Sequence, residues 1–315
     1  MDNLITVATQ VGILFALMAV GFACRKRGLL TDASIRGIVE ILVVIVTPAL
    51  VLHAFQRPYD PAMLRGLGFV ALAAGVGHAV AIALVCVLIR HRRKPTQNVL
   101  RVAAVFSNAG FMGIPLDQAI LGDAGVFYGV VYVGVFNIVM WSWGYCTIRN
   151  VPARALLGPA AQSMFVNPGT VGLALGLPVF FASYTLPPVL HEPVKCLADL
   201  NTPLAMIVIG YYLAGARFGA MFRTPAAYVA SAFRLLGFPL LMIGALWVLK
   251  DRLALDRTMM LALVVSASAP VAALTSMLAA KYDSDVDISV GIVSGTTLLS
   301  ILTMPPVIAF AMNVL

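Results

Sequence analysis

The sequence has little charge, and this scarcity excludes most classes of soluble protein. Only 11% of its 315 residues are Asp, Glu, Lys or Arg, whereas 61% are hydrophobic and the mean hydropathy is +0.97. A soluble domain needs a polar surface and does not reach this balance. The net charge of +8 is carried by cations in short loops between apolar runs, as membrane topology requires. We therefore expect an integral membrane protein that has no nucleic-acid partner.

The sequence also lacks patterns for catalysis and metal binding. Its four cysteines have neither metal-ligand nor redox spacing, so we interpret them as small apolar packing residues. It contains no phosphate-binding loop for ATP hydrolysis, no nucleophile beside a base and no carboxylate pair at membrane depth. We therefore expect a protein that is not an enzyme and that binds neither a metal nor a cofactor.

What the sequence does contain is a series of ten apolar runs, each close to the ~20 residues that a bilayer requires. No segment between them is long enough to fold as a soluble domain. The runs predict an all-α membrane protein with ten transmembrane helices, at about residues 4–24, 36–55, 64–89, 99–121, 124–147, 168–186, 194–215, 225–249, 256–280 and 287–311.

The loops on the two sides of these runs differ in charge. Alternate loops carry twelve Lys and Arg residues on one side and six on the other. By the positive-inside rule the first side is cytoplasmic, which places both termini outside when there are ten spans. The cations at 25–27 follow the first run, so this run is typical of an uncleaved anchor. We expect a plasma membrane protein, in the inner membrane if the source is a bacterium.

Prolines recur at matched positions in the two halves of the chain. Pro48 and Pro203 are 155 residues apart, and so are Pro115 and Pro270. Such spacing indicates an internal repeat, and five spans per copy would insert the second copy inverted relative to the first. The predicted division is a first repeat over 1–148, a short cytoplasmic linker over 149–164 and a second repeat over 165–315.

The stretch "SNAGFMGIP" at 107–115 places polar and helix-breaking residues in the middle of the fourth run. In transporters, inverted pairs of interrupted helices meet near the bilayer midplane, where substrate binds. A proline can begin a half-helix, whose free amides and partial positive charge attract an anion. We therefore expect the fourth and ninth helices to be broken and to cross, with Pro115 and Pro270 beginning their second halves.

Several motifs resemble the auxin efflux carrier family over essentially the whole chain: "SNAGFMGIPL" followed by "LGDAG", "NTPLAMIVIG", and "SASAPVAALTSMLAAKY". The resemblance implies a ten-helix inverted-repeat fold with crossing helices. Helices one, two, six and seven would form a dimerising scaffold, and helices 3–5 and 8–10 a transport domain that moves as an elevator. The chain differs from the plant exporters in its short linker, and in having Val70 and Ala74 where they have Asp and Lys.

These observations predict a secondary transporter of small organic anions that works by alternating access. Bacterial proteins similar to this chain are commonly described as malate or malonate permeases, and auxin-like acids are a further substrate class that the resemblance implies. A sodium-coupled organic anion symporter of the bile-acid type is the alternative, so co-transport of H⁺ or Na⁺ is left open. The expected partners are the substrate, the lipid bilayer and a second copy of the chain.

The candidate site residues fall into three groups. Polar groups and prolines near the breaks and on neighbouring spans are expected to contact substrate: Thr47, Ser107, Asn108, Pro115, Tyr132, Asn137, Ser268 and Pro270. Asn108 could instead form hydrogen bonds with backbone groups that the break leaves unpaired. The same structural role is the alternative to substrate binding for Pro48, Asn201, Thr202 and Pro203. Carboxyls within or beside membrane spans are costly, which makes them candidates for proton coupling: Glu40, Asp117 and Asp199. Asp117 would alternatively stabilise the first turn of the second half-helix.

Overall fold

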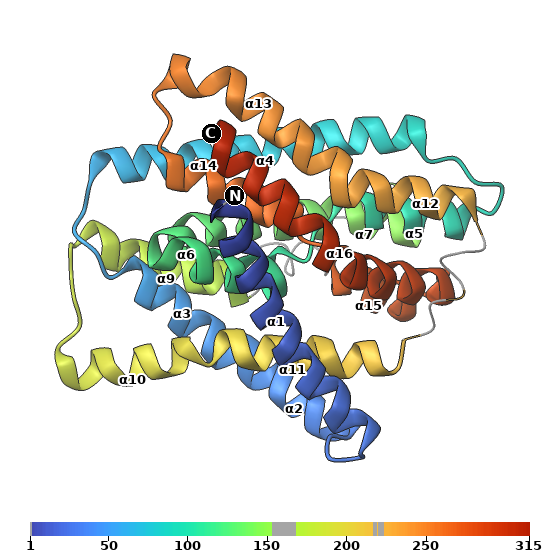
Figure 1. The fold of residues 1–315 in the computed structure, drawn as a ribbon, viewed down its shortest axis with the longest axis horizontal. Coiled ribbons are helices and arrows are strands. Elements are labelled where there is room, and N and C mark those ends of the chain that lie inside the picture. Colours follow the sequence, from blue (N-terminus) through green and yellow to red (C-terminus); the bar gives the residue numbers. More distant parts are fainter. Residues whose placement is uncertain (1, 153–167, 217–218, 220–223) are drawn as a thin grey trace.

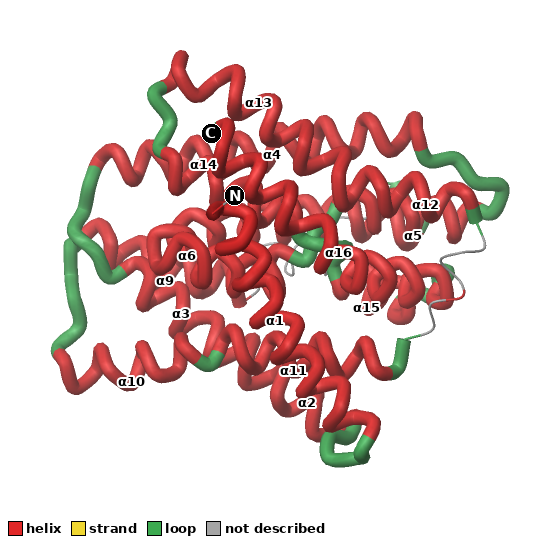
Figure 2. Tube along the Cα trace, in the orientation of Figure 1, coloured by secondary structure: helices red, strands yellow, loops and turns green. Residues whose placement is uncertain are grey.

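The computed structural model describes residues 2–152, 168–216, 219 and 224–315, which are helical apart from turns, loops and one isolated β-bridge (Figures 1 and 2). The prediction of an all-α protein is confirmed for these residues. Most of the predicted linker at 149–164 lies outside them.

The helices of the first half are α1 Asp2–Lys26, α2 Asp32–Ile41, α3 Thr47–Phe55, α4 Pro61–Leu88, α5 Lys94–Val105, α6 Ile114–Val139 and α7 Tyr145–Arg149. Those of the second half are α9 Pro168–Phe181, α10 Pro188–Asp199, α11 Asn201–Ala214, α12 Pro225–Ala232, α13 Phe238–Leu253, α14 Arg257–Ser268, α15 Ala273–Lys281 and α16 Val286–Val314. Short π-helical turns join or precede some of them: η1 Leu42–Val46, η2 Ala109–Gly113, η3 Met140–Gly144 and η6 Phe233–Gly237.

Seven helical stretches in the described residues are long and apolar enough to cross a membrane. Two shorter apolar helices, at 171–181 and 257–268, accompany them. One of the seven, Ala109–Arg149, contains 41 residues and includes parts of both the fourth and the fifth expected span.

The chain folds back inside this long stretch, at Gly122. Gly122 has φ 65° and ψ −156°, which are not helical values. A side chain added at Gly129 would touch the Asp117 carboxylate, and one added at Gly125 would touch the Asp117 carbonyl. Residues 117 and 129 of a straight helix would be about 18 Å apart, so α6 consists of two helices that pack against each other. This turn separates the fourth expected span from the fifth.

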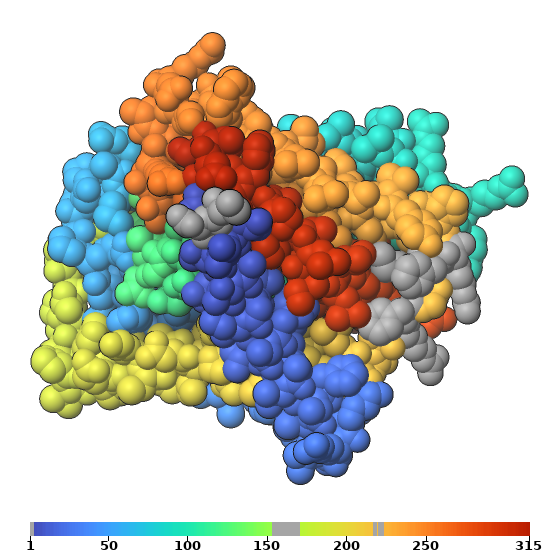
Figure 3. Space-filling model, in the orientation of Figure 1, coloured from blue at the N-terminus to red at the C-terminus, as the bar shows by residue number. Residues whose placement is uncertain are grey.

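The helices lie along two opposite sides of the molecule, with further helices between them. In Figure 1, α2, α3, α10 and α11 lie along one side, and α4, α12 and α13 lie along the opposite side. α1 packs along α11 and α16, and α3 packs along α9 and α10. In the space-filling view, α1 and α16 lie next to each other on the visible face (Figure 3).

The contact between α1 and α11 depends on two glycines. A side chain on Gly21 would collide with the backbone of Ile207, and one on Gly210 would collide with the backbone of Met18. The two helices therefore approach until their backbones touch, as small residues allow in membrane helix pairs.

The spacing of 155 residues that we inferred from the prolines does not fit all of the helices. α5 and α14 are both 12 residues long, and their first residues differ by 163 positions (257 minus 94). The first residues of α4 and α12 differ by 164 (225 minus 61). An offset of 155 instead places Pro115, which is helical, on Pro270, which is not. Proline fits both a first helical turn and an extended connection, so Pro115 and Pro270 do not mark equivalent positions, whereas Pro48 and Pro203 both lie in first helical turns.

Candidate functional site

Two of the described helices are interrupted, and their interruptions lie against each other. The backbone is not helical at 106–108, between α5 and η2, or at 269–272, between α14 and α15. Ser107 and Val271 form an isolated antiparallel β-bridge between the two interruptions. The predicted breaks in the fourth and ninth apolar runs are therefore present, and they are in direct contact.

Backbone hydrogen bonds connect these two segments. The Asn108 N–H donates to the Pro270 carbonyl at 2.6 Å, and the Ala272 N–H donates to the Phe106 carbonyl at 2.9 Å. α14 ends here because a residue that precedes proline is driven out of the helical region, and Ala269 accordingly has φ −61° and ψ 148°. Each segment thus supplies backbone partners that the other lost when its helix stopped.

Pro115 does not begin a half-helix, contrary to our expectation. The helical path resumes at Ala109 in η2 and continues into α6, where Pro115 is the second residue. Pro270, in contrast, lies within the non-helical segment itself. Asp117 lies in the first turn of α6, as predicted, although the helical path itself begins eight residues earlier, at Ala109 in η2.

A buried arginine holds the ends of both interrupted helices. Arg234, in η6, has no exposed surface. Its Nη1 donates to the Val105 carbonyl at 2.7 Å, and its Nη2 donates to the Ala267 carbonyl. These carbonyls belong to the last turns of α5 and α14, where backbone acceptors have no helical partner. One guanidinium therefore caps two helix ends beside the place where the two interruptions meet, which we call the crossing.

The charges at the crossing do not cancel. A helix C-terminus carries roughly half a negative charge, so two of them offset the charge of Arg234. No carboxylate lies within ion-pair distance of Arg234 in the described chain, where the one ion pair is His53 with Asp123. The second halves begin at η2 and α15, and each adds roughly half a positive charge. Arg234 and the four helix ends thus leave an excess of about one positive charge, which favours an anionic ligand when the nearby buried acid Asp117 is protonated.

Polar side chains with unused hydrogen-bonding capacity surround the bridge. Ser107 and Tyr132 are fully buried, and within the described chain neither hydroxyl makes a hydrogen bond of normal geometry, although the two groups are neighbours. Asn108 is 6% exposed, and its amide has no side-chain hydrogen bond to the described residues. Buried polar groups in proteins are normally paired, so these three could pair with a polar ligand.

Asp117 is a buried acid close to the crossing. It has no exposed surface, and its Oδ2 accepts a hydrogen bond from the Ser266 hydroxyl of α14 at 3.4 Å. Its Oδ1 has no partner in the described chain, and the bare backbone of Gly129 leaves room for the carboxyl group. A carboxyl within a membrane span is by default a functional candidate.

A second polar cluster lies between α3, α6 and the junction of α10 with α11. It surrounds a cavity of about 180 Å³, and His53 Nε2 lies 3.7 Å from Asp123 Oδ2 beside it. The structure brings three of the predicted residues together here, but not with Ser107 and Asn108. The cavity is lined by Leu50, His53, Gln118, Asp123, Ala198, Asp199, Asn201 and Thr202.

The hydroxyls of two predicted substrate contacts form hydrogen bonds with backbone carbonyls of their own helical stretches. Thr47 donates to the Leu42 carbonyl at 2.9 Å, and Ser268 donates to the Val264 carbonyl at 2.6 Å. Glu40 is exposed on α2.

The remaining predicted residues lie within helices. Pro48 and Pro203 are in the first turns of α3 and α11, and Asn137 is half-buried on α6. Sequence reasoning missed Arg234, although an arginine inside the apolar run at 225–249 was a visible signal.

Comparisons with known proteins gave matches over most of the chain. A family model described as "Membrane transport protein" matches residues 6–308. The chain is also similar to an "Uncharacterized transporter" of Methanothermobacter thermautotrophicus, at 24% identity over 299 residues that cover 92% of this chain and 93% of the relative.

Proposed function

Because the chain belongs to the membrane transport protein family, which includes the auxin efflux carriers, we propose that it is a secondary transporter of small organic anions. The substrates are mono- or dicarboxylates such as malate or malonate, or auxin-like acids. The observation that carries this proposal is the contact between the two interrupted helices beside Arg234. The charge of Arg234 is balanced by the C-termini of α5 and α14. The N-termini of η2 and α15, with their free amides, can therefore attract an anion.

The substrate carboxylate binds at the bridge. Asn108 donates a hydrogen bond through its side-chain amide, and the Ser107 and Tyr132 hydroxyls supply further donors. Their burial strengthens such bonds, because a carboxylate accepting hydrogen bonds away from water has few competing partners. Nothing in this arrangement requires a reaction, in keeping with a carrier rather than an enzyme.

Transport occurs by an elevator movement of one part of the protein against the other. α1, α2, α3, α9, α10 and α11 form the scaffold, which pairs with a second copy. The remaining helices move as a unit. Much of the contact between the parts is apolar, and Met112, Leu116 and Ile308 pack beside Val11 and Ile209 across it. The polar links across it include the hydrogen bond between Asn3 and Asn313 and the ion pair of His53 with Asp123. The apolar area can slide at little cost, which supports this mechanism, whereas these polar links would have to break.

Proton coupling through Asp117 fits the structure better than sodium coupling. Asp117 is buried beside α14 with one free carboxyl oxygen. Two of the three serines that could ligate sodium are already engaged, since Ser266 donates to Asp117 and Ser268 donates to its own helix, which leaves only Ser107. The protein would reside in the plasma membrane with both termini outside, as the loop charges predict.

Uptake into proteoliposomes tests this function. The purified protein would be screened against C2 to C6 carboxylates and indole acids, with and without sodium and with and without a pH gradient. We expect saturable uptake of at least one anion, no requirement for sodium, and weaker uptake by the Asn108→Ala variant. Saturable uptake of cations alone, or no uptake of any acid, would overturn the proposal.

A further inference from the structure

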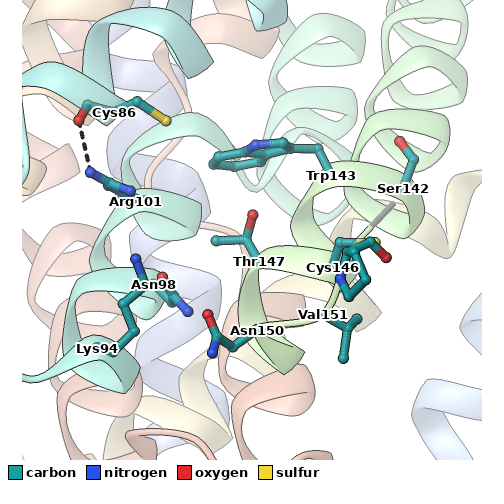
Figure 4. A pocket seen from close by; sticks show the side chains of 11 residues that line it. Cys86, Lys94, Asn98, Arg101, Ser142, Trp143, Cys146, Thr147, Asn150 and Val151 are labelled. Atoms are coloured by element: carbon teal, nitrogen blue, oxygen red, sulfur yellow. Dashed lines mark hydrogen bonds between the residues drawn. The ribbon is translucent and has the colours of Figure 1, made fainter. Parts of the chain in front are cut away.

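A pocket of about 660 Å³ lies at the end of the molecule that the loop charges predict to be cytoplasmic. Its walls are the end of α4, the first turns of α5 and the segment from η3 to the residues after α7 (Figure 4). Two cations and no carboxylate line it, since Lys94 and Arg101 are among the lining residues and Asp and Glu are not. The pocket is therefore electropositive.

Asn98 supplies a buried and unused polar group inside the pocket. This residue is only 4% exposed, and its side chain makes no hydrogen bond to the described part of the chain. Figure 4 shows Asn98 on α5 facing Thr147 and Asn150 across the pocket. A group with several acceptor oxygens could bind between these side chains and the two cations.

The corresponding position in the second half of the protein shows what is special about Lys94. α14 begins with Arg257, which lies 163 residues after Lys94. Arg257 donates to the Met312 carbonyl near the end of α16 and is thereby satisfied. The side-chain ammonium group of Lys94, at the start of α5, makes no hydrogen bond to any described residue. Lys94 in the first half is therefore available to a ligand, whereas Arg257 in the second half is bonded to the protein's own backbone.

The surroundings of the pocket point to a lipid. Cys86, at the rim, is exposed, and next to it on α4 Val87 and Leu88 are 64% and 53% exposed. Such apolar side chains at a membrane-facing surface contact acyl chains. All lining residues come from the α4 to α7 segment and none from α1, α3 or α11, so the pocket is not between the two parts that slide in the proposed mechanism. It is a separate site.

We infer that this pocket binds the phosphate headgroup of an anionic phospholipid, whose acyl chains lie along α4. The Lys94 ammonium group binds the phosphate, and Asn98 donates a hydrogen bond to it. Arg101 donates to the Ile89 and Cys86 carbonyls (Figure 4), so it contributes its positive charge beside the phosphate. Basic pockets between helices on the cytoplasmic side are suited to such headgroups. This inference does not depend on the proposed transport function.

Trp143, which lines the pocket, can report on the bound lipid. The chain contains two other tryptophans, so the variant Trp141→Phe/Trp247→Phe leaves Trp143 as the sole fluorophore. This variant would be placed in phosphatidylcholine vesicles containing a minor fraction of phosphatidylglycerol, with brominated chains on one lipid or the other. We expect brominated phosphatidylglycerol to quench Trp143 more than its mole fraction predicts, because each cation near the surface adds about fivefold in preference.

Matched variants distinguish the pocket from general surface charge. Lys94→Gln and Asn98→Ala should lower the preference for phosphatidylglycerol, whereas Arg92→Gln should retain it, because Arg92 is exposed in the same loop but does not line the pocket. Equal quenching by both lipids would overturn the inference, and so would an equal loss in all three variants. A final arm adds inorganic phosphate, and removal of the preference by millimolar phosphate would show a site for free anions instead.

Discussion

The backbone N–H of Asn108 donates to the carbonyl of Pro270 at 2.6 Å, although the two residues are 162 positions apart. The bond fixes the main chain of Asn108 at the point where both interrupted helices stop. Its side chain is therefore held beside the bridge by its own backbone, without any side-chain partner in the described residues. A rigid residue with a free amide is suited to binding a ligand, because little ordering is needed when the ligand arrives.

We expect Asn108→Ala to weaken anion binding by roughly ten- to a hundredfold. The variant loses one hydrogen bond to a charged group, about 1.5–3 kcal/mol. Asn108→Asp should bind more weakly still at neutral pH, because an ionised carboxylate would repel the substrate where the dielectric is low. Calorimetry on purified protein, with a carboxylate identified by the uptake screen, measures both effects.

A matched control for this test is Asn313→Ala. Asn313 is on α16, where it bonds to Asn3 at the exposed surface, and its loss should leave affinity unchanged. If Asn108→Asp binds the anion as well as wild type at neutral pH, the carboxylate lies elsewhere. If Asn108→Ala binds normally, Asn108 serves only the backbone.

Arg234→Gln should destabilise the protein by about 2 kcal/mol or more. The change removes donors from two buried carbonyls, and each unsatisfied buried group costs about 1–3 kcal/mol. Arg234→Lys should be intermediate, since it keeps the charge but not the planar pair of donors. Thermal unfolding in detergent measures the loss, with Arg252→Gln as control because Arg252 is an exposed cation on α13. An unchanged unfolding temperature in Arg234→Gln would show that the arginine does not hold the helix ends.

The sequence predicted where the fourth helix breaks but not what closes the break. Serine, asparagine and glycine at 107–110 marked an interruption because such residues favour turns over helix, and the structure is non-helical at 106–108. The partners of Arg234, however, are the carbonyls of Val105 and Ala267. Backbone carbonyls occur at every residue, so no pattern of side chains could have identified them.

The equal spacing of the prolines misplaced Pro270 for a related reason. A proline shows that an N–H is absent, but a helix start and an extended segment both tolerate that absence. The tertiary contact with Asn108 decides that Pro270 lies in an extended segment. In the structure, α5 and α14 are of equal length and both end where the bridge begins.

Replacing the two prolines should therefore have unequal effects. Pro270→Ala restores an N–H within the extended segment and lets α14 continue, which would draw the Pro270 carbonyl away from Asn108. Pro115→Ala changes a residue that is already helical and should leave uptake close to wild type. Initial uptake rates in proteoliposomes, normalised to inserted protein, give the comparison. Equal losses in both variants would indicate that the two prolines have equivalent roles after all.

Asp117→Asn should abolish the response of uptake to a pH gradient. The amide has nearly the same shape and can still accept a hydrogen bond from Ser266, but it cannot carry a proton. We expect uptake by wild type to change when a pH gradient is imposed, and uptake by the variant to be the same with and without it. Asp251→Asn is the control, since Asp251 is exposed on α13. A variant that still responds to the gradient would exclude Asp117 as the proton carrier.

Gly21→Ala should destabilise the contact between α1 and α11, whereas Gly12→Ala on the same helix should not. A side chain at position 21 would overlap the backbone of Ile207, but nothing lies within 4 Å of a side chain at position 12. Overpacking costs about 1–3 kcal/mol, and the better helix propensity of alanine recovers at most about 1 kcal/mol. Gly12→Ala gains the helix propensity of alanine without any overpacking. The unfolding temperatures of the two variants in detergent should therefore move in opposite directions. If α1 and α11 belong to a rigid scaffold, the Gly21→Ala protein that remains folded should transport at the wild-type rate. A normal unfolding temperature for Gly21→Ala would mean that the two backbones do not touch there.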